Sequence, residues 1–262
     1  MEKIKVFLSD PQVLFREGIH FTLSGEEDFE VTGEATSNEE AFTFIEANPP
    51  NIAILNMKNG KLNGPSITRR IKRNFPSVSV MLVADIEDEE QLFLATRCGA
   101  SALLTKDCSP DYLLDLIRVV AQGSQPIIES LLIPGMASRI LEEFEAISPL
   151  SEQLDNILAR LSPREAEILG SITAGNGIEQ IAASLNSNEE TIRRHLRAIV
   201  NKLLANDQAQ VVIEAAQRGL PSIFPGAASG DKLAAGYVTK AEFDEFKESL
   251  MQRFKSFITE SA

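Results

Sequence analysis

The first 120 or so residues alternate short apolar runs with amphipathic segments, and this alternation constrains the fold more than any other feature. Five runs have the length and composition of strands: Ile4–Leu8, Phe29–Glu34, Ile52–Leu55, Val78–Val83 and Ala102–Leu104. Five other segments have helical apolar spacing: Leu14–Leu23, Asn38–Glu46, Asn63–Asn74, Asp88–Arg97 and Pro110–Gln122. Such alternation predicts an α/β fold in which a doubly wound, five-stranded parallel sheet is covered by helices on both faces.

The C-terminal half has a purely helical pattern. Four helices are expected, from Ser162 to Gly175 and over Ile178–Leu185, Glu189–Leu204 and Asp207–Arg218. Ser162 and Glu165 form a capping box that starts the first of them. A short helix, a four-residue turn and a longer helix are typical of a helix-turn-helix motif, so this all-α domain is predicted to bind duplex DNA.

The end of the chain has its own pattern. Residues 221–238 are rich in Pro, Gly, Ala and Ser, and an amphipathic helix is expected over residues 239–262. Its apolar stripe contains Phe243, Phe246, Leu250, Phe254 and Phe257. Because so large a stripe is unfavourable on a free helix, we expect it to pack on its own domain, pair with a second copy or bind a partner such as RNA polymerase, with self-association favoured.

Composition excludes several classes of protein. The formal net charge of −13 argues against non-specific coating of nucleic acid, so any DNA contact must come from a local basic patch. No apolar run approaches the roughly 20 residues that span a bilayer, so no membrane association is expected. The two cysteines, without a C-x-x-C spacing, fit a reducing cytoplasm. The motifs of the common hydrolases, nucleotide-binding proteins and zinc proteases are absent, so we expect no enzyme, metal or cofactor.

Short motifs in both halves resemble the NarL/FixJ family of response regulators, in which a flavodoxin-like receiver domain precedes a LuxR-type helix-turn-helix domain. The receiver resemblance rests on Leu14–Gly18, Val31–Ala35, Cys98–Ser101 and Thr105–Asp107. The LuxR-type resemblance rests on Leu161–Glu165, Ile181-Ala182, Thr191–His195, Lys202-Leu203 and Arg218–Leu220. The expected organisation is a receiver over residues 1–123, a helical linker over 124–160, a DNA-binding domain over 161–220, a flexible linker over 221–238 and the terminal helix.

The resemblance implies a phosphorylation pocket, and this sequence departs from it. A receiver of that family has two acidic residues after the first strand, an aspartate acceptor after the third, a hydroxyl after the fourth and a lysine after the fifth. The corresponding residues here are Asp10, Pro11, Asn56, Ala84 and Lys106. Asn56 alone is compatible with an engineered trap, but together with Pro11 and Ala84 it indicates natural degeneration.

We therefore expect Mg²⁺ to bind weakly or not at all, since it prefers several carboxylate oxygens. Asp10 and Lys106 are expected to form a structural ion pair. Asp85 is a remote candidate for a substitute acceptor. Leu103 stands where the family usually has an aromatic residue that reports phosphorylation.

The recognition helix of the predicted motif is strongly basic. By resemblance, its DNA-facing residues are Glu190, Thr191, Arg193, Arg194 and Arg197. Lys202 belongs to the same basic cluster and is also expected to reach DNA. Many relatives have lysine where Glu190 stands, and a carboxylate there repels phosphate or changes base preference. Because one such helix reads only a few base pairs, a homodimer is expected.

Two functions are compatible with these patterns. The first is a phosphorylation-independent, sequence-specific transcription regulator that binds double-stranded DNA as a dimer. The second is an interaction regulator, an adaptor or antagonist that binds a regulatory protein and has weak or no DNA binding. The basic cluster from Arg193 to Lys202 favours the first, whereas the acidic net charge and Glu190 favour the second.

Overall fold

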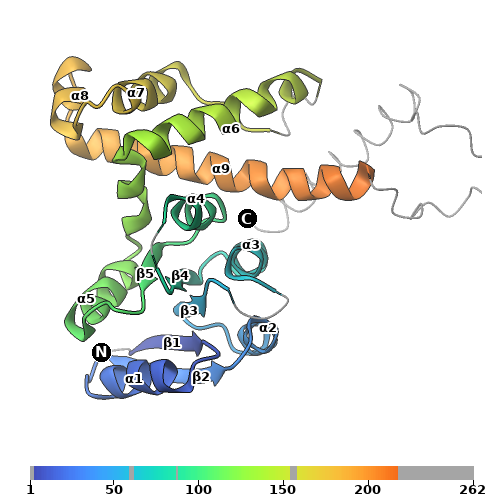
Figure 1. The fold of residues 1–262 in the computed structure, drawn as a ribbon, viewed down its shortest axis with the longest axis vertical. Helices are drawn as coiled ribbons and strands as arrows, with labels where there is room; N and C mark the ends of the chain where they lie inside the picture. Colours follow the sequence, from blue (N-terminus) through green and yellow to red (C-terminus); the bar gives the residue numbers. More distant parts are fainter. Residues whose placement is uncertain (1–2, 59–61, 87, 154–157, 218–262) are drawn as a thin grey trace, which may run out of the picture. The chain divides into compact units, whose positions relative to one another are not determined.

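The structure is a computed structural model that describes residues 3–58, 62–86, 88–153 and 158–217 (Figure 1). The chain divides into two compact units, Met1–Arg218 and Gly219–Ala262. The expected terminal helix and its five apolar stripe residues lie outside the described residues.

Strands and helices alternate through the first half, as the sequence predicts. The elements are β1 (Ile4–Ser9), α1 (Val13–Ser24), β2 (Phe29–Ala35), α2 (Asn38–Ala47), β3 (Ile52–Asn56), α3 (Gly64–Asn74), β4 (Ser79–Ala84), α4 (Glu89–Arg97), β5 (Ala102–Thr105) and α5 (Pro110–Ala121). The five strands are parallel in the order β2-β1-β3-β4-β5, which confirms the predicted α/β fold class.

The sheet has a helix layer on each face (Figure 1). Because successive side chains on a strand point to opposite faces, Phe7 packs toward α2, α3 and α4 while Val6 and Leu8 pack toward α1 and α5. Central strands that are buried on both faces need continuous apolar runs, and every residue of β3 is buried. The carboxyl ends of the strands therefore form one edge at which polar side chains meet.

The second half is helical. Its elements are the 3₁₀ helix η1 (Pro126–Leu132), α6 (Pro134–Gln153), α7 (Pro163–Thr173), α8 (Ile178–Ser184) and α9 (Glu189–Gln217). The predicted capping box is present, since Ser162 and Glu165 each accept a hydrogen bond from the other's backbone N–H. Asn188 accepts a hydrogen bond from the Thr191 backbone N–H (2.8 Å) and so begins α9 where the sequence predicts.

The helix α9 is longer than expected. The sequence predicts one helix that ends at Leu204 and another that begins at Asp207, but the structure has a single helix of 29 residues. Asn206 and Asp207 are residues that often cap helices. Here their side chains are engaged elsewhere: Asn206 bonds the backbone of Ala159, and Asp207 pairs with arginines. No glycine or proline lies within α9, so the helix continues.

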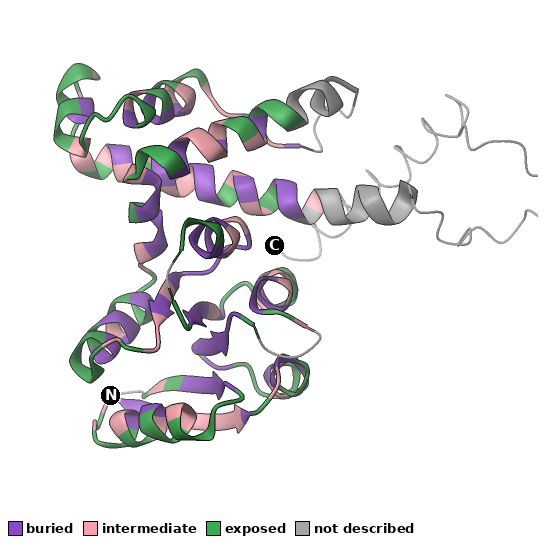
Figure 2. Cartoon of the chain, viewed as in Figure 1, coloured by how far each residue is buried: buried purple, intermediate pink, exposed green. Residues whose placement is uncertain are grey.

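The inward face of α9 forms the core of the helical half (Figure 2). The buried side chains are Ile192, Leu196, Ile199, Val200 and Leu203, the set that helical spacing predicts. They pack with Ile181 and Ala182 of α8. Within the described part of the chain, no helix is long and apolar enough to cross a membrane.

Candidate functional site

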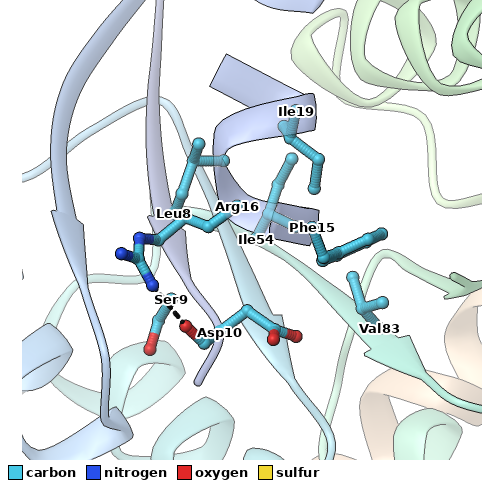
Figure 3. Close-up of a pocket in the computed structure, with 8 residues that line it drawn as sticks. All are labelled: Leu8, Ser9, Asp10, Phe15, Arg16, Ile19, Ile54 and Val83. Atoms are coloured by element: carbon cyan, nitrogen blue, oxygen red, sulfur yellow. Dashed lines mark hydrogen bonds between the residues drawn. The ribbon is translucent and has the colours of Figure 1, made fainter. Parts of the chain in front are cut away.

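The carboxyl edge of the sheet brings together the residues of the expected phosphorylation pocket. Asp10 follows β1, Asn56 ends β3, Ala84 ends β4 and Lys106 follows β5. These four strands are consecutive neighbours in the sheet, so residues far apart in sequence become adjacent. Figure 3 shows the Asp10 side chain at this edge, with Arg16 of α1 donating to its backbone carbonyl at 2.8 Å.

Asp10 is the centre of a closed hydrogen-bond network. Its Oδ2 accepts a hydrogen bond from Asn56 Nδ2 at 2.6 Å and lies 3.2 Å from Lys106 Nζ. Its Oδ1 accepts from the backbone N–H of Gln12 at 2.7 Å. The side chain is only 5% exposed, so each of these bonds replaces water that the buried carboxylate has lost.

Both polar atoms of the Asn56 side-chain amide make hydrogen bonds. While Nδ2 donates to Asp10, Oδ1 accepts from the backbone N–H of Lys58 at 2.8 Å. Asn38, which is fully buried, donates from Nδ2 to the Asn56 carbonyl at 3.2 Å. An aspartate at residue 56 lacks the N–H that this arrangement uses, so the local structure fits an amide.

Lys106 joins two carboxylates. Its Nζ lies 3.2 Å from Asp10 Oδ2 and 3.0 Å from Asp85 Oδ1, and 5.3 Å from the ring centre of Phe15. The Asp10–Lys106 ion pair is the one that the sequence predicts. The contact of Asp85 with Lys106 was missed; the only signal for it is that Asp85 directly follows β4.

Residues of α9 that are expected to face DNA are distributed around the helix. Glu190 and Arg194 are exposed, whereas Thr191 and Arg197 are half-buried. Glu190 and Arg194 are four residues apart and so share one side of the helix. The exposed side of α9 therefore includes both a carboxylate and a guanidinium.

Arg193 is already paired with carboxylates. Its Nε lies 2.9 Å from Glu129 of η1, and another guanidinium nitrogen lies 3.1 Å from Glu189. The hydrogen bond with Glu129, and then the one with Glu189, raise the pKa of Arg193. A DNA phosphate that approaches Arg193 therefore has to compete with Glu129.

Lys202 forms an ion pair with Glu165 of α7. Its Nζ donates to Glu165 Oε2 at 2.6 Å, and the Glu165 side chain is 5% exposed. Burial alone would raise the pKa of Glu165, but the hydrogen bonds from Lys202 and Ser162 outweigh burial and lower it. The pair links the start of α7 to the middle of α9, which gives Lys202 a structural role that sequence reasoning did not assign.

Both halves match known protein families. Residues 6–118 match the response regulator receiver domain, and residues 159–215 match the bacterial regulatory proteins of the LuxR family. The first match lies in the α/β half, which we call the receiver domain. The second match covers α7, α8 and most of α9.

Curated relatives are similar to this chain over most of its length and of their own. The transcriptional regulatory protein DegU of Brevibacillus brevis is 28% identical, over 83% of this chain and 94% of its own. The transcriptional regulatory protein LnrK of Bacillus subtilis is 28% identical, over 84% of this chain and all of its own (100%). The solved RcsB response regulator of Salmonella typhimurium has 22% identity and a TM-score of 0.45, over 80% of this chain and 99% of its own. The two curated relatives are named as transcriptional regulators and not as enzymes, in agreement with the prediction.

The residues of the receiver pocket do not fit the Mg²⁺ that receiver domains use. A hard divalent cation needs several oxygen ligands, but Pro11 and Asn56 leave Asp10 as the carboxylate in place, and the Lys106 ammonium already lies against it. No group of three metal-ligating side chains occurs among the described residues. The cavity beside Asp10 measures about 10 Å³, roughly the space of one water molecule.

The two cysteines are free thiols. Cys98 at the end of α4 is fully buried, and burial raises its pKa to about 12. Burial also raises the pKa of Cys108. Both thiols therefore stay protonated near neutral pH.

Proposed function

We propose that this chain is a sequence-specific transcription regulator that binds duplex DNA through α9, as a homodimer, without phosphorylation of its receiver domain. The observation that carries the proposal is the 2.6 Å hydrogen bond from Asn56 Nδ2 to Asp10. The residue at the acceptor position is an uncharged donor that is held by its neighbours. It offers neither a nucleophilic oxygen nor a second carboxylate for a metal ion.

The remaining pocket residues support the same proposal. Phosphorylation in receivers acts through a hydroxyl and a lysine that bind the phosphoryl oxygens. Ala84 has no hydroxyl, and Lys106 is held between Asp10 and Asp85. The Lys106 ammonium thus supplies a counter-ion for Asp10 from within the protein, where a working receiver uses a bound metal ion.

The DNA-binding part of the proposal rests on the exposed side of α9. Arg194 is exposed there, and the LuxR-type match covers the whole helix up to residue 215. Since the formal net charge is −13, attraction to DNA has to be local, and Arg194 is the exposed arginine of the recognition segment.

The proposal is tested by anisotropy of a labelled mixed-sequence duplex, titrated at several salt concentrations, and by selection of bound sequences from a random library. Arg194→Ala is expected to weaken binding and to lower the slope of log K against log salt by about 1, because one phosphate contact is lost. Arg73→Ala is the matched control: it removes the same charge from an exposed residue of α3. Equal effects of both variants, or no binding by the wild type at low salt, would contradict the proposal.

A protein-interaction regulator is the second candidate, and the surface of α1 favours it. Leu14 and Phe21 of α1 are 87% and 83% exposed. Between α1 and α5 lies a groove of about 210 Å³ whose lining includes Leu14, Gly18 and Leu113. Exposed apolar groups that gather beside a groove mark surfaces that another protein covers.

Sedimentation of the wild type and of the double variant Leu14→Asp, Phe21→Asp separates these roles. If α1 pairs two copies, the double variant is monomeric whereas Ile86→Asp, a control at an apolar residue that is 65% exposed, is not. A wild type that binds no duplex and whose assembly depends on Leu14 and Phe21 favours the second candidate. If the double variant is still a dimer, the surface that pairs two copies does not include Leu14 and Phe21.

A further inference from the structure

One stripe of α9 contacts the receiver half of the molecule. Arg193, Arg197, Val200, Leu204 and Asp207 follow one another at spacings of four, three, four and three, which keeps them on one side of the helix. Arg193 at one end pairs with Glu129 of η1, and the other end reaches the receiver domain itself. Accordingly, α9 contacts α4 and η1 as well as α7 and α8.

Asp207 is the ionic anchor of this stripe. Its side chain is 3% exposed, and its carboxylate pairs with Arg69 of α3 and with Arg97 of α4. Arg69 makes a two-point contact through Nε and a second nitrogen, and Arg97 Nε lies 2.8 Å from Asp207 Oδ1. Arg97 also bonds Glu143 of α6 at 3.1 Å. A carboxylate so deeply buried is stable only while its partners stay in place.

An apolar contact lies beside the anchor. Leu204 packs on Gly99, where an added Cβ would lie 2.7 Å from a Leu204 methyl group. Gly99 has a φ of +80°, so glycine is needed both for the backbone and for the close approach. We call Arg69, Arg97, Gly99, Leu204 and Asp207 the α9 joint.

The apolar core is continuous through the joint. Leu82 of the sheet, Phe93 of α4, Leu131 of η1 and Ile199 of α9 belong to one connected set of buried side chains. Residues 1–218 accordingly form one compact unit that contains both domains. Separation of the domains would expose this apolar surface to water and leave Asp207 without its arginines.

We propose that the α9 joint is a permanent support, in which Asp207 is a positioning residue that fixes α9 on the receiver domain. The two domains then unfold as one cooperative unit. The joint also holds α9 in a fixed orientation, with Glu190 and Arg194 on the side that faces DNA. The part that concerns DNA rests on the proposed function; the part that concerns folding does not. If the joint instead inhibited DNA binding, its removal would increase the affinity for DNA.

Differential scanning calorimetry of the full chain tests the folding part. The wild type is expected to unfold the two domains in a single transition, and Asp207→Ala is expected to split it into two or to lower its midpoint clearly. Asp115→Ala is the matched control, since Asp115 is 78% exposed and pairs with Arg118 at 3.5 Å. Two transitions in the wild type, or an Asp207→Ala profile like that of Asp115→Ala, overturn the proposal. If Asp207→Ala does not fold, Asp207→Asn is measured in its place.

Anisotropy with the mixed-sequence duplex tests the part that concerns DNA, at a temperature where circular dichroism shows each variant folded. Asp207→Ala is expected to weaken binding by about tenfold, an ordinary coupling between distant sites. The slope of log K against log salt stays unchanged, because Asp207 contacts no phosphate, whereas Arg194→Ala lowers it. Equal or tighter binding by Asp207→Ala overturns the supporting role. If the wild type binds no duplex, the proposed function fails and calorimetry alone decides the joint.

Discussion

Asn56 is the residue of the receiver domain on which the proposed function depends most. In the structure it is a hydrogen-bond donor to Asp10 and an acceptor from Lys58. A change from carboxylate to amide at this position converts a group that would repel Asp10 into one that stabilises it. The pocket thus differs from a receiver's acceptor site in its hydrogen bonds as well as in its charge.

Asn56→Asp is therefore expected to destabilise the protein. The substitution removes the donor to Asp10 and places a second carboxylate against the first, at a cost of about 1–3 kcal/mol for the unsatisfied buried group. Urea unfolding near neutral pH measures the effect, with Asn48→Asp at an exposed position as the control. A variant as stable as the wild type would show that the Asn56 amide contributes nothing.

The ion pair of Glu165 with Lys202 predicts a pH dependence. The folded pKa of Glu165 lies below its ordinary value of 4.5. The pair thus stabilises the fold fully above that value, and the contribution is lost as the pH falls through the folded pKa. Glu165→Gln keeps a capping side chain but removes the charge. Its unfolding free energy is expected to be lower than that of the wild type at neutral pH and to converge with it in acid; a difference that stays constant with pH would rule out the charge as the cause.

At the scale of elements, helix ends and strand positions can be predicted from sequence wherever local chemistry decides them. The capping box of α7, the alternating apolar faces and the order of strands and helices are all local signals. The continuity of α9 is not local. Asn206 and Asp207 resemble the start of a new helix until Ala159, Arg69 and Arg97 take up their side chains. Tertiary partners that lie up to 138 residues away cannot be found from spacing.

Substitution of Ala205 tests the continuity of α9. Ala205 is exposed and lies in the interior of the single helix, so Ala205→Gly is expected to cost about 1 kcal/mol of stability. Ala174→Gly is the control, because Ala174 ends α7 and glycine is well tolerated after a helix. Chemical denaturation compares the two. Equal, near-zero effects would mean that α9 is interrupted near residue 205.

At the scale of the whole molecule, sequence predicts both domains and the set of pocket residues, because motif order and strand ends carry that information. It does not predict which polar groups satisfy one another. The hydrogen bond between Asn56 and Asp10, the Asp85–Lys106 pair and the assignment of Lys202 to Glu165 all depend on side-chain packing. In each case the missing information is the position of a partner from another element.

In the proposed function, the receiver domain acts without a phosphoryl group. The most direct test treats the full chain with Mg²⁺ and acetyl phosphate, then measures intact mass and duplex affinity on the same sample. We expect an unmodified mass and unchanged affinity. A stoichiometric phosphoryl adduct on an aspartate of the receiver domain, accompanied by a change in affinity, would contradict the account.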